Sequence, residues 1–249
     1  METPAAASAS ASASAAPPKK KLPPLKAESW LVELALEGFG TTSVSVPLGA
    51  TEPRPIVIAL HGAGDRPEWQ CGTWTGIAGR AFVVCPRGVP HPGYPASAPR
   101  YTWKSVADTE RELRSALHAL KARFGEYVAP GSVVLTGFSL GASHAVNILR
   151  EEPSFFARVV LVEGGAREFT PTLGAVFAKN GGKRMVFVCT QPACKPAALT
   201  AVRLTERGGA PAELVDAGNL GHVLDGRAAA AIKPRFQALV ADDPRWKTE

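Results

Sequence analysis

Short, largely apolar runs recur along most of this chain, and segments with helical spacing separate them. Continuous apolar runs are typical of strands that are buried on both faces of a parallel sheet. Six such runs lie at residues 56–60, 81–85, 133–135, 158–162, 184–188 and 213–215. Ahead of them, residues 30–36 and 42–46 alternate apolar with polar positions on either side of a Gly-Phe-Gly turn, which predicts an antiparallel hairpin.

The segments between the apolar runs predict helices. Residues 106–124 carry an apolar stripe at helical spacing, and Gly125 ends that segment. Further helices are expected at 142–149, 172–180, 196–207 and 226–240, the last with Asp225 as its N-cap. Strands that alternate with helices form an open, mostly parallel sheet covered on both faces. We therefore expect an α/β fold over residues 28–249, with eight strands that begin with the antiparallel hairpin.

The first 27 residues differ in composition from the rest of the chain. Residues 1–16 are nearly all alanine and serine, and a stretch rich in proline and lysine follows. Residues 1–27 hold four lysines against one glutamate, so half of the net charge of +6 lies there. Such a segment has little to bury and predicts a solvated tether. We interpret it as the tether of an exported protein, attached to a membrane through a leader that this sequence lacks; a tail without a role is the alternative.

The composition of the remaining chain excludes two classes of function. Hydrophobic residues make up 45% of the 249 residues, which is enough to fill a core. No basic stripe alternates with aromatic residues, so we expect no nucleic-acid partner. No apolar run approaches the roughly 18 residues of a membrane-spanning helix, so we expect none.

The apolar run at 133–135 leads into Gly137-Phe-Ser-Leu-Gly141, and a helical segment follows. A strand, a tight turn and a helix in that order force the residue at the apex, Ser139, into a strained conformation and lift its hydroxyl above the sheet. Side chains two positions before and after the apex would collide, which accounts for Gly137 and Gly141. The backbone N–H of Leu140 then points to where an oxyanion would form. The pattern therefore indicates a nucleophilic serine.

This serine turn resembles that of the α/β-hydrolase superfamily, whose layout also has eight strands with the serine after the fifth. Leu60-His-Gly-Ala-Gly-Asp65 is similar to the corresponding turn of the carboxylesterase and phospholipase/acyl-thioesterase branch, and of the related dienelactone hydrolases and polyester and feruloyl esterases. The resemblance implies that the backbone N–H of Ala63 is the second oxyanion donor. We interpret His61 as a structural turn residue and Asp65 as part of a helix-capping box.

The superfamily places its catalytic histidine in the loop after the last strand. Here Val215-Asp-Ala-Gly-Asn-Leu-Gly-His222 runs from the last predicted strand into a glycine-rich loop. The other four histidines fall in the oxyanion turn, in a proline-rich loop and in two helices. The resemblance therefore implies that His222 is the base that takes the proton of Ser139.

The third member of the triad departs from the family pattern. The usual aspartate after the seventh strand is absent from Val188-Cys-Thr-Gln-Pro-Ala-Cys-Lys195. Glu163, at the end of the sixth strand, preserves the chain order of serine, acid and histidine and is the expected acid. Two alternatives stay open: Asp216 as the acid, or no acid at all, in a weak esterase or a non-catalytic relative.

The four cysteines allow two disulfides. Cys189 and Cys194 flank a Gln-Pro turn after the seventh predicted strand, where a disulfide would brace the loop that lacks the usual acid. A metal site is disfavoured because the pair has no second ligand pair at the usual spacing, and free thiols in a reducing cytoplasm are the alternative. Together with the tether, the pair favours an extracytoplasmic location, either periplasmic or secreted.

Two tryptophans lie in the loops after the third and fourth strands, which rim the ligand-binding end of the sheet in this fold. We expect Trp69 and Trp103 to contact substrate; packing of the loops is the alternative. The sequence thus predicts a single-domain serine hydrolase that cleaves small-molecule carboxylic esters through an acyl-enzyme, without a metal or cofactor. Other hypotheses are a catalytically weak or dead binding protein of this fold at the cell surface, and cleavage of peptides, lactones or thioesters.

Overall fold

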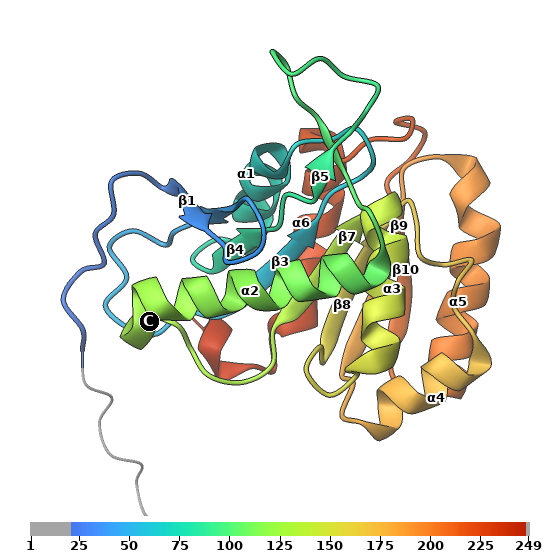
Figure 1. Cartoon of the computed structure of the whole chain (residues 1–249). Helices are drawn as coiled ribbons and strands as arrows, with labels where there is room; N and C mark the ends of the chain where they lie inside the picture. The colour runs from blue at the N-terminus through green and yellow to red at the C-terminus, as the bar shows by residue number, and fades with distance from the viewer. Residues whose placement is uncertain (1–20, 248–249) are drawn as a thin grey trace, which may run out of the picture.

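The computed structural model describes residues 21–247 and contains the predicted eight-stranded sheet. The strands lie in the order β1-β2-β4-β3-β7-β8-β9-β10 (Figure 1). β2 pairs antiparallel with β1 and with β4, and the other neighbouring strands are parallel, as predicted. The strands are β1 (Leu31–Ala35), β2 (Thr41–Ser45), β3 (Ile56–Leu60), β4 (Phe82–Cys85), β7 (Val134–Phe138), β8 (Arg158–Val162), β9 (Arg184–Cys189) and β10 (Ala212–Asp216).

Helices cover both faces of the sheet because its central strands are apolar on both faces. In β3, for example, Ile58 packs in one hydrophobic core and Val57 in the other. α2 to α5 pack on the core that contains Ile58, whereas α1 and α6 pack on the opposite core (Figure 1). The helices are α1 (Pro67–Ala78), α2 (Val106–Phe124), α3 (Leu140–Glu151), α4 (Pro171–Lys179), α5 (Lys195–Arg207) and α6 (Gly226–Val240), and the 3-10 turns are η1 (Gly125–Tyr127), η2 (Pro192–Cys194) and η3 (Pro244–Trp246).

The helix ends test the capping predictions. α2 spans the predicted residues and ends at Gly125, and the Asp225 carboxylate caps α6 by accepting the N–H groups of Arg227 and Ala228. The capping box at Asp65 is wrong, because α1 begins one residue later than such a box requires, with Arg66 at its N-cap. The Asp65 carboxylate instead accepts the backbone N–H of Arg66 and the side-chain N–H of Gln70.

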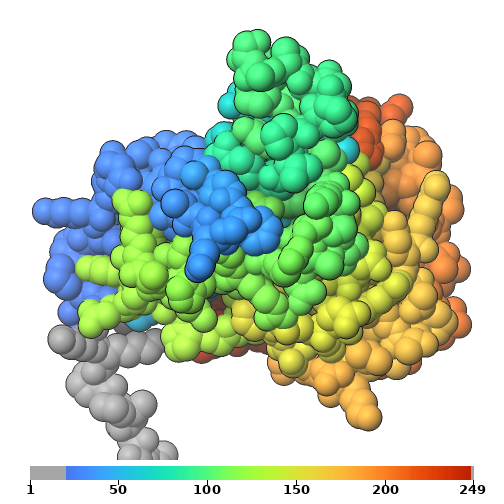
Figure 2. Space-filling model, viewed as in Figure 1, coloured from blue at the N-terminus to red at the C-terminus, as the bar shows by residue number. Residues whose placement is uncertain are grey.

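The proline-rich segment after β4 forms a second, two-stranded sheet that the sequence did not predict. β5 (Val89–Pro90) and β6 (Tyr101–Thr102) pair antiparallel, and the hairpin stands out from the body of the molecule at the top of Figure 2. Its base is fixed to the loop after β3, because the carbonyl of Tyr101 accepts the N–H of Gly64 at 2.9 Å and the N–H of Tyr101 donates to Asp65. The hairpin therefore borders the loop that carries Ala63.

The N-terminal boundary of the domain lies earlier than the predicted residue 28. Leu25 is only 5% exposed and belongs to the core, and its backbone N–H donates to Ala50 at 2.9 Å. The Tyr127 hydroxyl also donates to the carbonyl of Pro23. Leu25 reaches an apolar surface of the domain and packs there, although its neighbours are prolines and lysines. Residues 1–20 of the predicted tether lie outside the described residues.

The four cysteines form two disulfides. Cys71 on α1 is joined to Cys85 at the end of β4, with 5.9 Å between the Cα atoms. Cys189 and Cys194 are joined with a Cα separation of 5.5 Å, as the sequence suggested. Two disulfides are compatible with an oxidising compartment. Within residues 21–247, no helix combines the length and the apolar character needed to cross a membrane.

Peptide mapping tests these pairings. Protein made in an oxidising compartment and digested without reduction should yield Cys71 linked to Cys85 and Cys189 linked to Cys194, because both Cα separations lie within the range that a disulfide spans. Mass spectrometry of the digest before and after reduction identifies the linked peptides. Free thiols at Cys189 and Cys194 in such material would contradict the pairing and remove the main argument for export.

Candidate active site

Ser139 lies at the apex of the turn between β7 and α3, with backbone angles φ 52° and ψ −119°. A non-glycine residue with this positive φ is strained, and such strain accumulates at functional sites. The neighbouring glycines make the turn possible. A Cβ atom at Gly137 would lie 2.6 Å from the carbonyl oxygen of Gly141, and one at Gly141 would lie 2.3 Å from that of Leu60. The steric reason that the sequence predicted for both glycines is therefore confirmed.

His222 lies in the loop between β10 and α6, and its ring faces the serine. The distance between His222 Nε2 and Ser139 Oγ is 2.7 Å, which is a hydrogen bond. The ring packs on Phe138, with 5.1 Å between the ring centroids, and the side chain remains 46% exposed. Solvent and substrate therefore have access to the pair.

Glu163 follows β8 directly, and its carboxylate lies on the other side of the imidazole. Glu163 Oε2 is 3.3 Å from His222 Nδ1, and the side chain is only 1% exposed. The backbone of Glu163 also has a positive φ, of 53°. The turn continues through Gly164, where a Cβ atom would lie 2.3 Å from the carbonyl oxygen of Ser139. The strained turn and the glycine bring the end of β8 against the serine turn.

Asp216, the other acid considered from the sequence, lies elsewhere. Its carboxylate is 2.5 Å from Lys195 Nζ and also accepts the N–H of Gly218. The hydrogen bond from Lys195 holds the pKa of Asp216 below its usual value. This carboxylate is exposed and already paired with Lys195. Of the two candidates, Glu163 is the one that lies beside His222.

The loop after β9, where the sequence lacks the usual aspartate, has a different part in the site. The backbone N–H groups of Thr190 and Gln191 both donate to Glu163 Oε1, the second at 3.0 Å. The Gln191 side-chain amide also lies 3.4 Å from His222 Nδ1. Sequence reasoning missed both residues, since backbone donors carry no residue signature. The available signals were the two glycines after Glu163 and the pair of cysteines around this loop.

The loop after β3 borders the serine on the opposite side. A Cβ atom at Gly62 would lie 3.2 Å from Ser139 Cβ, so this loop and the serine turn are in contact. The backbone N–H groups of Ala63 and Leu140 donate no hydrogen bond within residues 21–247. These two N–H groups, one next to Gly62 and one next to Ser139 in the chain, therefore have no partner within the described residues.

Buried groups support this loop from below. His61 is fully buried, with its ring nitrogens 2.8 Å from the carbonyl oxygens of Gly62 and Arg87. Trp103 stacks on that ring at 4.4 Å and donates its indole N–H to the His61 carbonyl. Trp103 is only 7% exposed, so it lies beneath the loop and not at the opening. His61 is a structural turn residue, as predicted.

Trp69, by contrast, lies on the surface and is 48% exposed. The guanidinium of Arg100 stacks on its ring at 4.5 Å and donates a hydrogen bond to the carbonyl of Gly64 at 3.1 Å. The same guanidinium lies 5.1 Å from the ring of Tyr94. This stack joins the protruding hairpin to the loop of Ala63.

Two buried titratable groups lie close to these elements. Burial raises the pKa of Glu112, whose carboxylate accepts the backbone N–H groups of Arg87 and Gly88. Burial lowers the pKa of His144 on α3, whose Nδ1 lies 2.9 Å from Thr109 Oγ1. In both cases burial disfavours the charged form, and for Glu112 the two backbone N–H donors act in the opposite direction.

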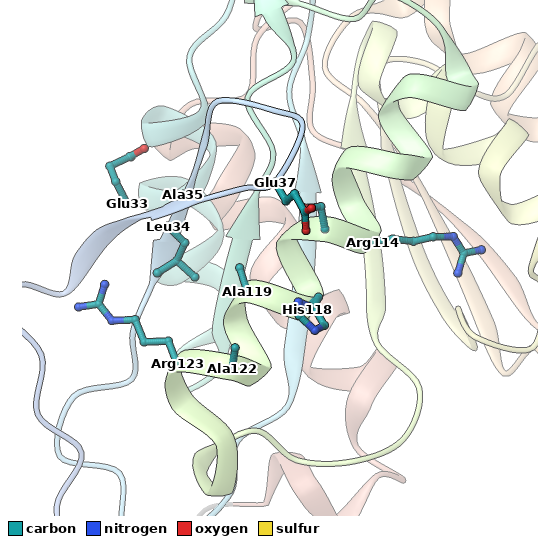
Figure 3. Close-up of a pocket in the computed structure, with 10 residues that line it drawn as sticks. Glu33, Leu34, Ala35, Glu37, Arg114, His118, Ala119, Ala122 and Arg123 are labelled. Carbon is teal, nitrogen blue, oxygen red and sulfur yellow. The ribbon is translucent and has the colours of Figure 1, made fainter.

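A cavity of about 410 Å³ opens beside Ser139 on the side of β8 and β9. Small residues form much of its wall, namely Gly164, Gly165, Ala166, Ala193 and Ala197, and polar side chains such as Gln191 and Glu168 complete it. A larger hollow of about 910 Å³ lies between β1 and α2 (Figure 3). Three of its charged side chains are paired with other residues: Glu33 with Arg87, Arg114 with Glu152, and Arg123 with Glu28. The cavity beside Ser139 is the candidate site because it contains the serine that is hydrogen-bonded to His222.

Comparison with known proteins supports this architecture at the level of the fold. No family model and no curated protein matches the chain. Among solved structures, it is similar to TT1662 from Thermus thermophilus, with 20% identity, a TM-score of 0.58 and coverage of 88% of this chain and 98% of that one. It is also similar to the Bacillus cereus carboxylesterase, with 20% identity, a TM-score of 0.54 and coverage of 75% and 89%.

A third similar structure is Est1E from Butyrivibrio proteoclasticus, with 10% identity and a TM-score of 0.60 over 86% of this chain and the full length of that one. Structures named as carboxylesterases or esterases are therefore similar to this chain over most of its length. The mostly parallel eight-stranded sheet and its helices match those structures. The chain therefore has the α/β-hydrolase fold.

Proposed function

We propose that the protein is a serine hydrolase that cleaves carboxylic esters through an acyl-enzyme. The observation that carries this proposal is the hydrogen bond of 2.7 Å between Ser139 Oγ and His222 Nε2, at a serine held on a strained turn. In the first step, Ser139 Oγ attacks the ester carbonyl while His222 takes its proton. His222 then gives this proton to the leaving alcohol as the ester C–O bond breaks and the acyl-enzyme forms. Water next attacks the acyl-enzyme while His222 takes its proton, and His222 returns a proton to Ser139 Oγ as the acid leaves.

Glu163 and two backbone N–H groups complete the proposed machinery. The buried carboxylate of Glu163 orients the imidazole and stabilises its charged form during the reaction. The N–H groups of Ala63 and Leu140 stabilise the negative charge that develops on the carbonyl oxygen. The cavity of about 410 Å³ has a wall of small residues, which supports a small-molecule ester as the substrate.

Labelling with a fluorophosphonate probe tests this proposal. The probe should attach covalently to the wild-type protein at Ser139, because an activated serine displaces its fluoride. A panel of p-nitrophenyl esters of increasing acyl length then measures activity and the size of the group that the cavity accepts. No labelling and no ester hydrolysis would favour a binding protein of this fold.

Trp69 is the surface residue that we propose as a substrate contact. Trp69→Ala should raise KM for aryl esters by about threefold to tenfold with little change in kcat, since stacking on an aromatic ring contributes roughly 0.5–1.5 kcal/mol. Trp30→Ala is the matched control, because Trp30 is equally exposed at 47% but precedes β1 at the far edge of the sheet. Equal KM values for the two variants would exclude this role.

The two disulfides support an extracytoplasmic location, either periplasmic or secreted, which we propose for this hydrolase.

A further inference from the structure

The carboxylate of Glu163 is fixed by the loop after β9. Two backbone N–H groups of this loop, from Thr190 and Gln191, donate to the same oxygen, Glu163 Oε1. The other oxygen, Oε2, faces His222 Nδ1 at 3.3 Å. The side chain is 1% exposed, so water cannot replace these donors without movement of the chain. The position of the carboxylate therefore depends on the position of this loop.

The same loop also holds the segment that carries His222. The hydroxyl of Thr190 donates to the carbonyl of Gly221 at 2.6 Å, and the N–H of Leu220 donates to the carbonyl of Thr190 at 2.7 Å. One residue, Thr190, thus contacts the acid through its backbone N–H and the loop of His222 through its hydroxyl and carbonyl. A shift of this residue would therefore disturb hydrogen bonds to the acid and to the loop of the base.

The disulfide between Cys189 and Cys194 encloses this loop. Cys189 is the last residue of β9 and is fully buried, and Cys194 ends the 3-10 turn η2 just before α5. The bond spans five positions, so Thr190 and Gln191 lie inside a short covalent ring. A cross-link of this kind limits the conformations of the enclosed backbone.

We propose that the Cys189–Cys194 disulfide is a positioning element for Glu163, and that full turnover requires it. The inference rests on the proposed function. Without the disulfide, the two N–H donors are free to leave Glu163 Oε1, and the carboxylate loses its fixed distance to His222. Because reaction rates depend on geometry at this scale, kcat should fall by about 10- to 100-fold while KM changes little. Reduction of this one bond would then lower activity reversibly.

The test compares two pairs of cysteine substitutions with p-nitrophenyl acetate as the substrate. Cys189→Ala with Cys194→Ala should lower kcat by about 10- to 100-fold. Cys71→Ala with Cys85→Ala is the matched control, since it removes the disulfide between α1 and β4 and should leave kcat close to that of the wild type. Equal kcat values for the two double variants would overturn the proposal.

A double-mutant cycle separates positioning of the acid from a general structural effect. In the Glu163→Gln background, loss of the Cys189–Cys194 bond should lower kcat by less than about threefold, because the carboxylate that it positions is already absent. The full 10- to 100-fold loss in that background would overturn the proposal. An inactive wild type would instead refute the proposed function, and the inference with it.

The Cys189→Ala, Cys194→Ala variant could fail to fold, and a second experiment then tests the proposal. It uses chemical reduction of the Cys71→Ala, Cys85→Ala variant. This variant contains only the Cys189–Cys194 bond, so a reductant should lower its kcat and reoxidation should restore it. The reaction contains EDTA, because Glu163 and the two freed sulfur atoms lie within 4.8 Å of one another and would be ligands for a metal ion. Unchanged kcat after reduction would also overturn the proposal.

Discussion

Replacement of Ser139 by alanine should abolish hydrolysis of a short p-nitrophenyl ester, with a loss in kcat on the order of 10⁶-fold, as removal of the nucleophile does in serine proteases. The expected loss is this large because the remaining groups have no atom to acylate. The fold should persist, since alanine keeps the Cβ atom that the strained turn already accommodates. Ester hydrolysis and thermal unfolding of the two proteins measure both effects.

Ser143→Ala is the control for this substitution. Ser143 lies one helical turn further along α3 and lines the same cavity, but its hydroxyl donates to Glu168 Oε1 at 2.7 Å and does not contact His222. Its loss should leave kcat within a few-fold of the wild type. If Ser139→Ala kept most of its activity, or if Ser143→Ala lost as much, Ser139 would not be the nucleophile.

Glu163→Gln should lower kcat by on the order of 10³- to 10⁴-fold and change KM little. The carboxylate stabilises the charged imidazole of the transition state and does not contribute to substrate binding. Glutamine retains the shape of the side chain and an oxygen that accepts the N–H groups of Thr190 and Gln191. It lacks the negative charge that stabilises the imidazolium of His222. Steady-state kinetics across the ester panel separate kcat from KM.

Asp216→Asn provides the matched loss of a carboxylate. Asp216 is exposed and paired with Lys195, so this substitution should be nearly silent. If Glu163→Gln were equally silent, the acid would have no role in turnover. The site would then act as a pair of Ser139 and His222, and a weak or non-catalytic protein of this fold would become the preferred hypothesis.

Local sequence was sufficient for the strands of the eight-stranded sheet, the serine turn and the last helix cap. Buried strands need apolar residues at successive positions, so Ile56–Leu60 and Arg158–Val162 were evident without knowledge of their neighbours. The turn at Ser139 was equally evident, because the two glycines are required by contacts within a few residues and with the adjacent strand. The N-cap at Asp225 involves only two N–H groups, those of Arg227 and Ala228.

Only the tertiary structure decided which carboxylate lies beside His222. The two residues are 59 positions apart, and their distance depends on the neighbouring positions of β8, β9 and β10 in the sheet. The donors that fix Glu163 are backbone N–H groups. Backbone hydrogen bonds of Tyr101 likewise fix the base of the hairpin. Such groups are present at almost every residue, so no residue type marks them. Local patterns also misled at two other places. The composition around Leu25 favoured a tether, but Leu25 packs in the core. The pattern at Asp65 favoured a helix cap, but its carboxylate accepts a hydrogen bond from the Gln70 side chain.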